Sequence, residues 1–460
     1  MVTRPAWAPT TILRLLYSGL RSSRDEWRGG ERGSLYALLG RSFSAVSGLV
    51  LIAVAAAQLT PAAQGYFLTF LSILLLQILL ELGFLQVLTQ FVSHEAADLT
   101  FDSRGGVSGP PTVRARLGAL IQLATRWYLA LGIALLLLVG GGGYLFFHVA
   151  GDDGVAWQLP WILLVVAQVA YVQLIALNGI LEGCGRVAAS QRAVLSGNVV
   201  GVAVGCAALL AGAGLYSLAL MVAARTVVAG PLLWTSARDL LALRTAAETG
   251  GGPDWRAKFW TQQRRIAMSW AAGFAMYQSF TPIAFAVQSP AVAGQVGVAA
   301  QAFLAVQYLG GAWVLAVHPR LGGLAAGSDL SGLRKLARET LSRSVATAVL
   351  TSVLGLTLLV AIKAVDPEYG ARFGDLGSIA LFFTAAIVLQ ASNVETAAVR
   401  FRKREPFVVV SFAGAVLVIG SNVLLGSLFG LPGMALGFVI IVSGILVPWT
   451  HRLYVRHTSS

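Results

Sequence analysis

The sequence predicts an all-α polytopic membrane protein of about 12 transmembrane helices, in two six-helix lobes related by a pseudo-two-fold axis along the membrane normal. Hydrophobic residues make up 57% of the chain and charged residues only 12%, whereas a soluble domain carries about 25% charged residues. The apolar residues also form continuous runs long enough for the roughly 20 residues of a helical crossing. They do not alternate with polar residues, as the strands of a membrane β-barrel require.

The hydrophobic pattern occurs twice along the chain, with about six apolar stretches in residues 35–240 and six more in residues 264–451. Similar short sequence motifs recur between the stretches of each half. These motifs are Thr60–Gly65 and Ser289–Gly294 after the first and seventh stretches, and Gly214–Leu220 and Gly430–Leu436 before the sixth and twelfth. A duplicated bundle with an even number of helices per half is typical of transporters, with the substrate path between the halves.

The helices are predicted in order along the chain. They lie near 35–59, 65–92, 117–148, 157–183, 193–211, 215–237, 266–288, 292–318, 344–363, 377–399, 407–427 and 433–451. Residues 1–34 form a basic cytoplasmic segment, either a short amphipathic helix on the membrane surface or a poorly ordered tail. Residues 241–263 link the lobes through a Gly-Pro cluster, and residues 452–460 form a cytoplasmic tail.

Proline and glycine positions refine this prediction. The Thr-Pro and Ser-Pro words are predicted as tight outer turns, in which proline stops one helix and Gly65 and Gly294 permit the turn. Pro282 is predicted to kink the seventh helix inside the membrane, either as a hinge or as a static packing feature.

The net charge of +13 is distributed unevenly. Of the 33 Lys and Arg residues, 28 fall on one side of the predicted membrane; Lys363 and Arg372 fall on the other, and three lie within helices. This bias predicts that both termini are cytoplasmic. It also accounts for the basic charge without nucleic acid as a partner.

The three arginines within helices are candidate substrate ligands, because a charged side chain inside a membrane usually faces a cavity or a partner. Arg225 in the sixth helix is predicted either to bind a phosphate, whose geometry the guanidinium matches, or to pair with an acid on another helix. Arg41 in the first helix either lines the cavity or extends to the inner surface. Arg126 in the third helix is a weaker candidate, beside the interfacial anchors Trp127 and Tyr128.

Three acids are candidates for ion coupling or gating. Glu81 in the second helix is expected to pair with Arg41 or Arg225, or to carry a coupled proton. Glu182 and Glu395 occupy corresponding inner ends of the fourth and tenth helices. They are expected either to pair with nearby arginines, Arg186 and Arg400 respectively, and gate the inner mouth, or to remain ordinary interfacial charges.

The sequence motifs around these residues resemble those of a known family. Thr60–Phe67 leading to Leu80–Phe84, together with Ser421–Ala435, is similar to the bacterial lipid-linked oligosaccharide flippases, the polysaccharide transporters of the multidrug/oligosaccharidyl-lipid/polysaccharide exporter superfamily. Leu181–Arg186 resembles their loop between the fourth and fifth helices, although arginine is commoner there in place of Glu182. The resemblance covers nearly the whole chain after residue 34.

The resemblance implies a bacterial inner-membrane flippase that moves an undecaprenyl-pyrophosphate-linked oligosaccharide, an O-antigen or other polysaccharide unit, from the inner to the outer leaflet. It implies two lobes around a cationic cavity that opens to one side at a time. It also implies membrane lipids and the polysaccharide polymerase machinery as partners.

The sequence fits other functions less well. The sequence has no Gly-rich nucleotide-binding word, no catalytic triad and no metal-ligand spacing, so we expect neither an enzyme nor a cofactor. The alternative is a cation-coupled multidrug exporter of the same fold, which is expected to have an acidic cavity. A membrane glycosyltransferase or ligase is disfavoured, because it normally needs clustered acids or a large outer loop.

Overall fold

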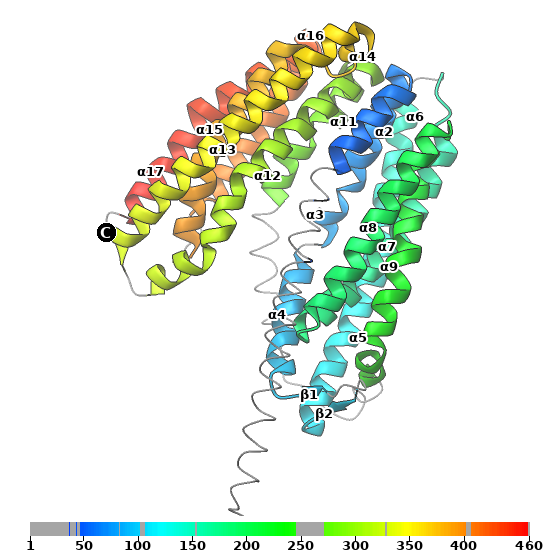
Figure 1. The fold of residues 1–460 in the computed structure, drawn as a ribbon, viewed down its shortest axis with the longest axis vertical. Coiled ribbons are helices and arrows are strands. Elements are labelled where there is room, and N and C mark those ends of the chain that lie inside the picture. The colour runs from blue at the N-terminus through cyan, green and yellow to red at the C-terminus, as the bar shows by residue number, and fades with distance from the viewer. Residues whose placement is uncertain are drawn as a thin grey trace, which may run out of the picture.

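The computed structural model describes residues 47–81, 83–101, 106–151, 154–244, 271–326, 329–401 and 406–458, together with Tyr36 and Phe43. These residues are mostly helical and form two groups of helices that lie close at one end and diverge toward the other (Figure 1). Nine of the described helices are long and apolar enough to cross a membrane, and Ser47–Gln58 is a shorter apolar helix. Each predicted stretch coincides with a described helix or part of one, so the all-α polytopic membrane fold is confirmed.

The first described helix of the first half is Ser47–Gln58. The elements after it are α2 (Pro61–Leu74), α3 (Gln77–Glu81), α4 (Phe84–Ala96), α5 (Pro111–Ala134), the π-helix η1 (Leu135–Gly141), α6 (Gly142–Ala150), α7 (Gln158–Gly183), α8 (Val187–Leu210) and α9 (Tyr216–Ala242). A short antiparallel hairpin joins α4 to α5. Its strands are β1 (Thr100–Phe101) and β2 (Val107–Ser108), with Thr100 opposite Ser108.

The second half comprises α11 (Phe280–Val287), α12 (Pro290–Ala326), α13 (Leu330–Val365), α14 (Pro367–Ala371), α15 (Leu376–Arg400), α16 (Val408–Ile441), the π-helix η3 (Val442–Leu446) and α17 (Val447–Thr458). A further helical segment, 271–278, precedes α11. Gly430 divides α16 into two spans, with a φ of +60°. The equivalent motif of the first half contains Gly214 with a φ of +57°, so both hairpins have a glycine with positive φ.

The Thr-Pro and Ser-Pro motifs lie at tight turns, as predicted, but their prolines begin the following helices and do not end the preceding ones. The Thr60 side chain accepts a hydrogen bond from the Ala63 N–H (3.2 Å), and Pro61 is the first residue of α2. Ser289 likewise accepts from the Val292 N–H (3.3 Å) ahead of α12. A helix start leaves its first N–H groups unbonded, so the missing proline N–H costs nothing there.

The second predicted helix is discontinuous. A turn at Leu75 and Leu76 separates α2 from α3, and Gly83, with a φ of +70°, separates α3 from α4. The seventh helix is interrupted at Ser279, just before Pro282, so the predicted kink is confirmed. Irregular backbone at membrane depth is tolerated where it is buried in protein or lines a cavity.

Two predicted boundaries move at the ends of the second half. The helix predicted to begin at residue 344 begins at Leu330, where the Asp329 side chain caps it by accepting from the Gly332 N–H (2.9 Å). The predicted tail from residue 452 is helical to Thr458. The segments 1–34 and most of the predicted linker 241–263 lie outside the described residues.

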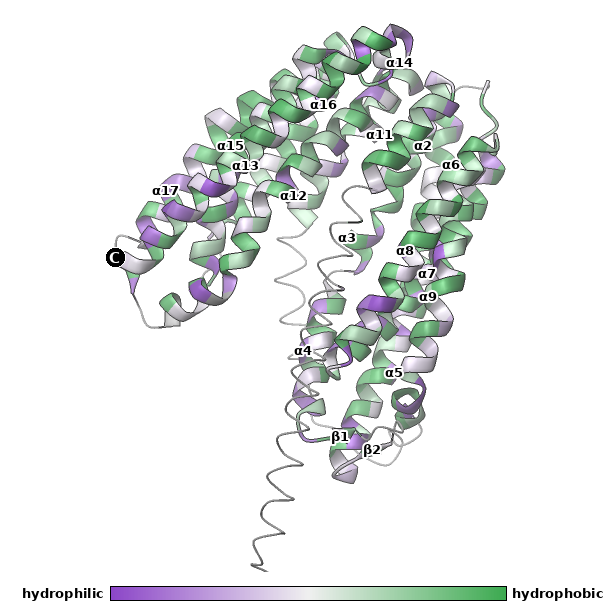
Figure 2. Cartoon of the chain, in the orientation of Figure 1, coloured by the Kyte–Doolittle hydropathy of each residue, from purple (hydrophilic) through white to green (hydrophobic). Residues whose placement is uncertain are grey.

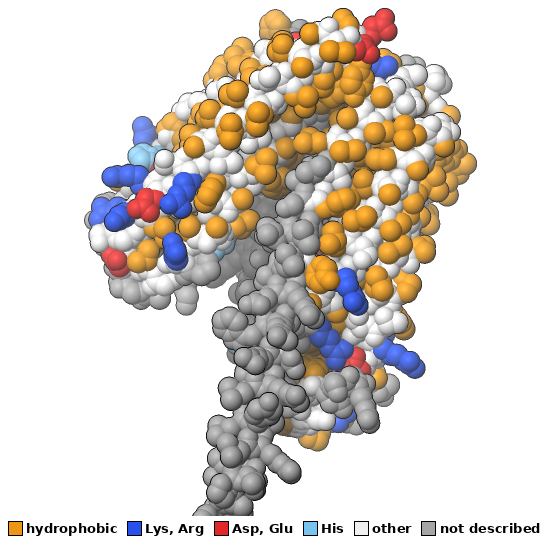
Figure 3. All heavy atoms as spheres, in the orientation of Figure 1, with side chains coloured by type: hydrophobic (Ala, Val, Ile, Leu, Met, Phe, Trp, Pro, Cys, Tyr) orange, Lys and Arg blue, Asp and Glu red, His pale blue; other side chains and the backbone are white. Residues whose placement is uncertain are grey.

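Hydropathy separates the two ends of the molecule from its middle. Apolar residues cover the helices along most of their length (Figure 2). Lys and Arg gather where the two groups diverge, and acidic side chains lie near α14 at the opposite end (Figure 3). We call these the basic end, with the loops at 97–110, 184–186 and 401–406, and the acidic end, with the loops at 151–157 and 366–375.

The two halves touch at the acidic end through repeat-related helix starts. A Cβ atom on Gly65 would lie 1.7 Å from the Pro290 carbonyl oxygen, and one on Gly294 would lie 3.5 Å from the Pro61 carbonyl oxygen. The contact is reciprocal, as expected where a two-fold axis relates the partners. The prediction that Gly65 and Gly294 permit turns is therefore wrong, because both lie inside helices and allow α2 and α12 to approach closely.

Hydrogen bonds from α14 and the residues around it reinforce this contact. The Tyr369 hydroxyl donates to the Ala53 carbonyl (2.9 Å), and Arg372 Nη1 donates to the Leu59 carbonyl (3.0 Å). Gln64 Nε2 donates in return to the Arg372 carbonyl (3.4 Å). The acidic end is thus closed by bonds that join the start of the first half to the second.

Candidate functional site

A cavity of about 810 Å³ lies between the broken second helix and the second half of the chain. The first half contributes Leu75, Ile78, Gln86 and Gln90, and helix 271–278 contributes Phe274, Tyr277 and Gln278 among others. The opposite wall is formed by α12, α15, α16, η3 and α17. Because the break in the second helix forms one wall, its irregular backbone faces a cavity instead of lipid.

About half of the described lining residues of this cavity are polar, and they carry little charge. Arg400 is the one charged side chain among its described lining residues, at the C-terminal end of α15. The other polar groups are amides and hydroxyls, carried by Gln86, Gln90, Gln278, Ser392, Asn393, Thr396, Ser411, Thr450, Tyr277 and Tyr308. Such a surface can bind an anion at one point and neutral hydroxyl-rich groups along the rest.

A chain of buried amides holds Asn393 in place. Asn393 Nδ2 donates to Gln307 Oε1 (2.9 Å), which also accepts from Gln390 Nε2 (3.1 Å). The Ser344 hydroxyl donates to Gln390 Oε1 (2.9 Å) and to the Gly310 carbonyl (2.6 Å). Gln390 and Ser344 are fully buried. These bonds join α12, α13 and α15 and fix the orientation of the Asn393 amide.

The predicted arginines are not brought together at this cavity. Arg225 lies among α7, α8 and α9, where its guanidinium donates to the Tyr171 hydroxyl and sits 3.8 Å from the centroid of that ring. Arg126 is exposed on α5. Neither residue is among the cavity's described lining residues, and Arg41 lies outside the described residues.

Glu81 has a described partner that was not predicted, whereas its expected pairing with Arg41 falls outside the described residues. The Tyr128 hydroxyl donates to Glu81 Oε1 (2.6 Å), beside the break at Gly83. The nearby Gln77 accepts from Gln168 (2.6 Å). A chain of polar contacts thus connects the broken second helix to α5 and α7.

Glu182 and Glu395 have separate partners. Glu182 Oε1 accepts from Gln191 Nε2 (2.5 Å) and Asn178 Nδ2 (3.3 Å). Glu395 Oε1 contacts His451 Nδ1 (2.6 Å). The predicted pairing of Glu182 with Arg186 is wrong, because Arg186 lies beyond the Cys184–Gly185 turn and faces α9.

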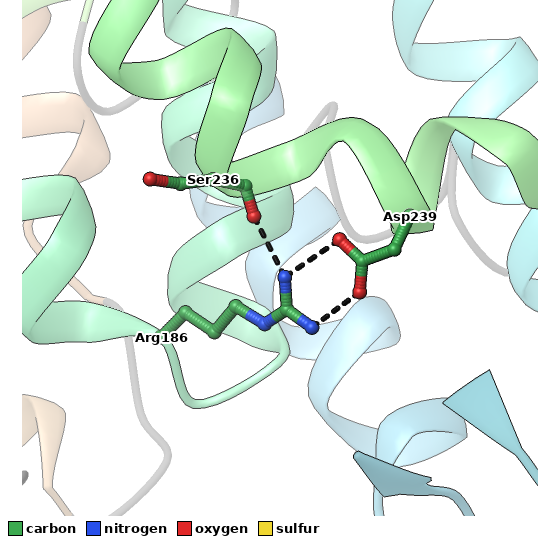
Figure 4. A network of polar contacts seen from close by, with 3 residues as sticks. All are labelled: Arg186, Ser236 and Asp239. Atoms are coloured by element: carbon green, nitrogen blue, oxygen red, sulfur yellow. Dashed lines mark hydrogen bonds and ion pairs between the residues drawn. The ribbon is translucent and has the colours of Figure 1, made fainter. Parts of the chain in front are cut away.

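Arg186 binds Asp239 at the basic end of the first half. Its two terminal nitrogens contact the two carboxylate oxygens of Asp239, and Nη1 also donates to the Ser236 carbonyl (2.7 Å) (Figure 4). The guanidinium lies 5.5 Å from the Phe101 ring centroid of β1. This network ties the α7–α8 loop, α9 and the β-hairpin together.

The sequence contained a signal for cavity residues that the prediction missed, such as Gln86, Gln90 and Thr396. Gln86 and Gln90 are four residues apart on α4, so they share one helix face. Asn393, Thr396 and Arg400 are three and four residues apart on α15, so they also share a face. Polar residues at helical spacing within an apolar segment are the pattern that marks a cavity wall. The prediction relied instead on single charged residues within helices, such as Arg225 and Arg126.

No family model and no curated protein matches this chain. Solved structures do resemble it. A lipid II flippase, MurJ, in an inward closed conformation has a TM-score of 0.67 at 11% identity, covering 93% of this chain and 87% of that one. A eukaryotic MATE transporter gives 0.58 at 12% identity, covering 94% and 98%. An inward-facing MATE transporter of the MOP superfamily gives 0.55 at 12%, covering 90% and 99%.

These similarities establish the fold. The chain has the fold of the multi-pass membrane transporters and flippases of the MOP superfamily. The cavity lies between the two halves of the chain.

Proposed function

We propose that this protein is a flippase that moves an undecaprenyl-pyrophosphate-linked oligosaccharide from the inner to the outer leaflet of a bacterial inner membrane by alternating access. The observation that carries the proposal is the cavity itself, which lies between the halves and whose described lining residues include one arginine and many neutral polar groups. An anionic head with a hydroxyl-rich sugar matches both kinds of group. With both termini cytoplasmic, the basic end faces the cytoplasm, and the closed acidic end faces outward.

Arg400 is the first phosphate ligand in this proposal. It replaces Arg225 and Arg126 in that role, because those side chains do not line the described cavity. Its place at the C-terminal end of α15 lies toward the basic end, where the head group enters from the inner leaflet. Arg41 stays a predicted second ligand.

The membrane potential can drive this movement. A pyrophosphate diester carries about two negative charges, and moving each outward from a negative interior releases about 2.3 kcal/mol per 100 mV. The protein must mainly shield the head group, because an isolated charge in an apolar medium costs tens of kcal/mol.

Binding to purified protein tests the proposal. Arg400→Ala should weaken binding of a polyprenyl pyrophosphate by about 10- to 100-fold, the equivalent of one charged hydrogen bond of roughly 1.5–3 kcal/mol. Arg400→Lys should recover part of it, because the ammonium lacks the planar fork. Arg452→Ala, which removes an exposed arginine of the basic end outside the cavity lining, is the matched control and should bind as the parent does.

The same titration separates the alternative. A cation-coupled multidrug exporter should bind tetraphenylphosphonium more tightly than a polyprenyl pyrophosphate. If the neutral polyprenol binds as tightly as the pyrophosphate, and Arg400→Ala changes the affinity for neither lipid, the anionic-substrate proposal is wrong.

A further inference from the structure

A second pocket of about 410 Å³ lies beside the cavity and is almost entirely apolar. It is formed by the broken second helix, the glycine-rich part of the third helix, α11 and α16. Its walls include Leu76, Leu79, Leu138, Phe146, Ile283 and Ile419. Its few polar lining groups are Ser72, Gln278 and Ser279.

The pocket adjoins the cavity. Phe274 and Gln278 of helix 271–278 line both spaces, so the two lie against the same stretch of one helix. A molecule with a polar head in the cavity would reach the pocket with an attached chain by passing these two side chains.

The pocket also opens toward the bilayer. Leu138 on its rim is 64% exposed, and Leu76 is 36% exposed. One turn after Leu138, the third helix has Gly142, which has no side chain. A Cβ atom placed on Gly142 would meet nothing within 4 Å, so the pocket is open at this point. A chain lying in the pocket can thus extend into the surrounding lipid.

We propose that this pocket holds the hydrocarbon chain of the transported lipid while its head group occupies the cavity. The inference rests on the proposed function and adds where the chain passes between the halves. Lipid tails are as apolar as leucine side chains, so the pocket gains little affinity from burying the chain. Its effect is to fix the path of the chain during transport, so crosslinking and flipping are the informative measurements.

Two neighbouring glycines give a matched pair of variants. Gly142 lines the pocket, whereas Gly141 is not among its lining residues, and a Cβ atom at either position meets nothing within 4 Å. Gly142→Phe should fill the pocket without forcing the helices apart. Gly141→Phe adds the same bulk one residue away.

The experiment uses the full-length protein in vesicles with a polyprenyl pyrophosphate that carries a diazirine in its chain. We expect peptides containing Leu138–Phe146 and Ile283 to be labelled, Gly142→Phe to remove most of that label and slow flipping about tenfold, and Gly141→Phe to change neither. A phosphatidylglycerol with the same diazirine is the comparison probe. If it labels the pocket equally, or if Gly142→Phe leaves the polyprenyl label intact, the proposal is overturned.

A short-chain probe separates this proposal from the proposed function. Geranyl pyrophosphate should bind parent and Gly142→Phe equally and bind Arg400→Ala more weakly. If it binds in this way but the long chain leaves the pocket unlabelled, only the chain path is wrong. If it fails to bind the parent, the anionic-substrate proposal fails first.

Discussion

At the scale of single residues, Arg186 and Asp239 show how a charge pair can hold a bundle together at a membrane surface. Their side chains are 23% and 19% exposed, so solvent screens the pair only partly. The guanidinium makes two parallel contacts with the carboxylate and a third with the Ser236 carbonyl. Such forked geometry is stronger than a single exposed ion pair.

Replacing Asp239 should therefore destabilise the first half. We expect Asp239→Asn to lower the free energy of unfolding by roughly 1.5–3 kcal/mol, the value of a hydrogen bond to a charged group. Thermal unfolding in detergent measures the change. Arg238→Ala, which removes the exposed neighbouring charge, should leave the melting temperature nearly unchanged. Equal melting of both variants would show that the pair contributes little.

At the scale of elements, α8 and α9 pack through glycines on one face of α8. Gly197, Gly201 and Gly205 recur every four residues, and a Cβ atom on Gly201 would lie 2.9 Å from the Met221 carbonyl oxygen and 3.0 Å from the Arg225 Cβ. Small residues at this spacing let membrane helices approach closely. The same row brings α8 against the backbone of Arg225, whose side chain then extends to Tyr171.

Enlarging the middle glycine should separate these helices. We expect Gly201→Leu to lower stability by about 1–3 kcal/mol, as overpacking does in a close-packed interior. The fraction of folded protein after heating and size-exclusion chromatography measures this. Val199→Leu lies on the same helix, where Val199 is 41% exposed, and should be neutral. A stable Gly201→Leu protein would mean that α8 and α9 can shift apart at no cost.

At the scale of the whole molecule, the closed acidic end is the contact that the proposed alternating access would have to break. Burial, with a smaller contribution from Asp366, raises the pKa of the Tyr369 hydroxyl that donates to the Ala53 carbonyl. A raised pKa means that the protonated donor persists in the folded state. Its contribution is therefore fully present below the ordinary tyrosine pKa of about 10 and is lost only as pH rises through the raised value.

Closure should consequently be insensitive to pH in the neutral range but sensitive to the hydroxyl. We expect Tyr369→Phe to shift the open-to-closed equilibrium at the acidic end by about fivefold toward open, the equivalent of about 1 kcal/mol for a neutral hydrogen bond. Distances between spin labels at Ala213 and Glu368 report this shift. Tyr216→Phe at the same end is the control and should leave the distances unchanged. A population that shifts between pH 6 and 8 in the parent would contradict the assignment to Tyr369.

The sequence by itself determined the membrane class and the all-helical fold. These features depend on hydropathy and on local backbone chemistry, and both are written in consecutive residues. Pro282 is an example, because a proline lacks the N–H that would continue the helix across Ser279. The recurrent hairpin glycines Gly214 and Gly430 likewise both have a positive φ.

Only the tertiary structure decided which side chains share a cavity. Arg225 and Arg400 look alike as charged residues near apolar segments, yet one stacks on Tyr171 inside the first half and the other lines the space between the halves. Gly65 and Gly294 read as turn residues, but they are where α2 and α12 approach each other. The direction a side chain faces depends on how its helix is rotated and on which helix lies beside it, and those are set by packing between segments far apart in the chain.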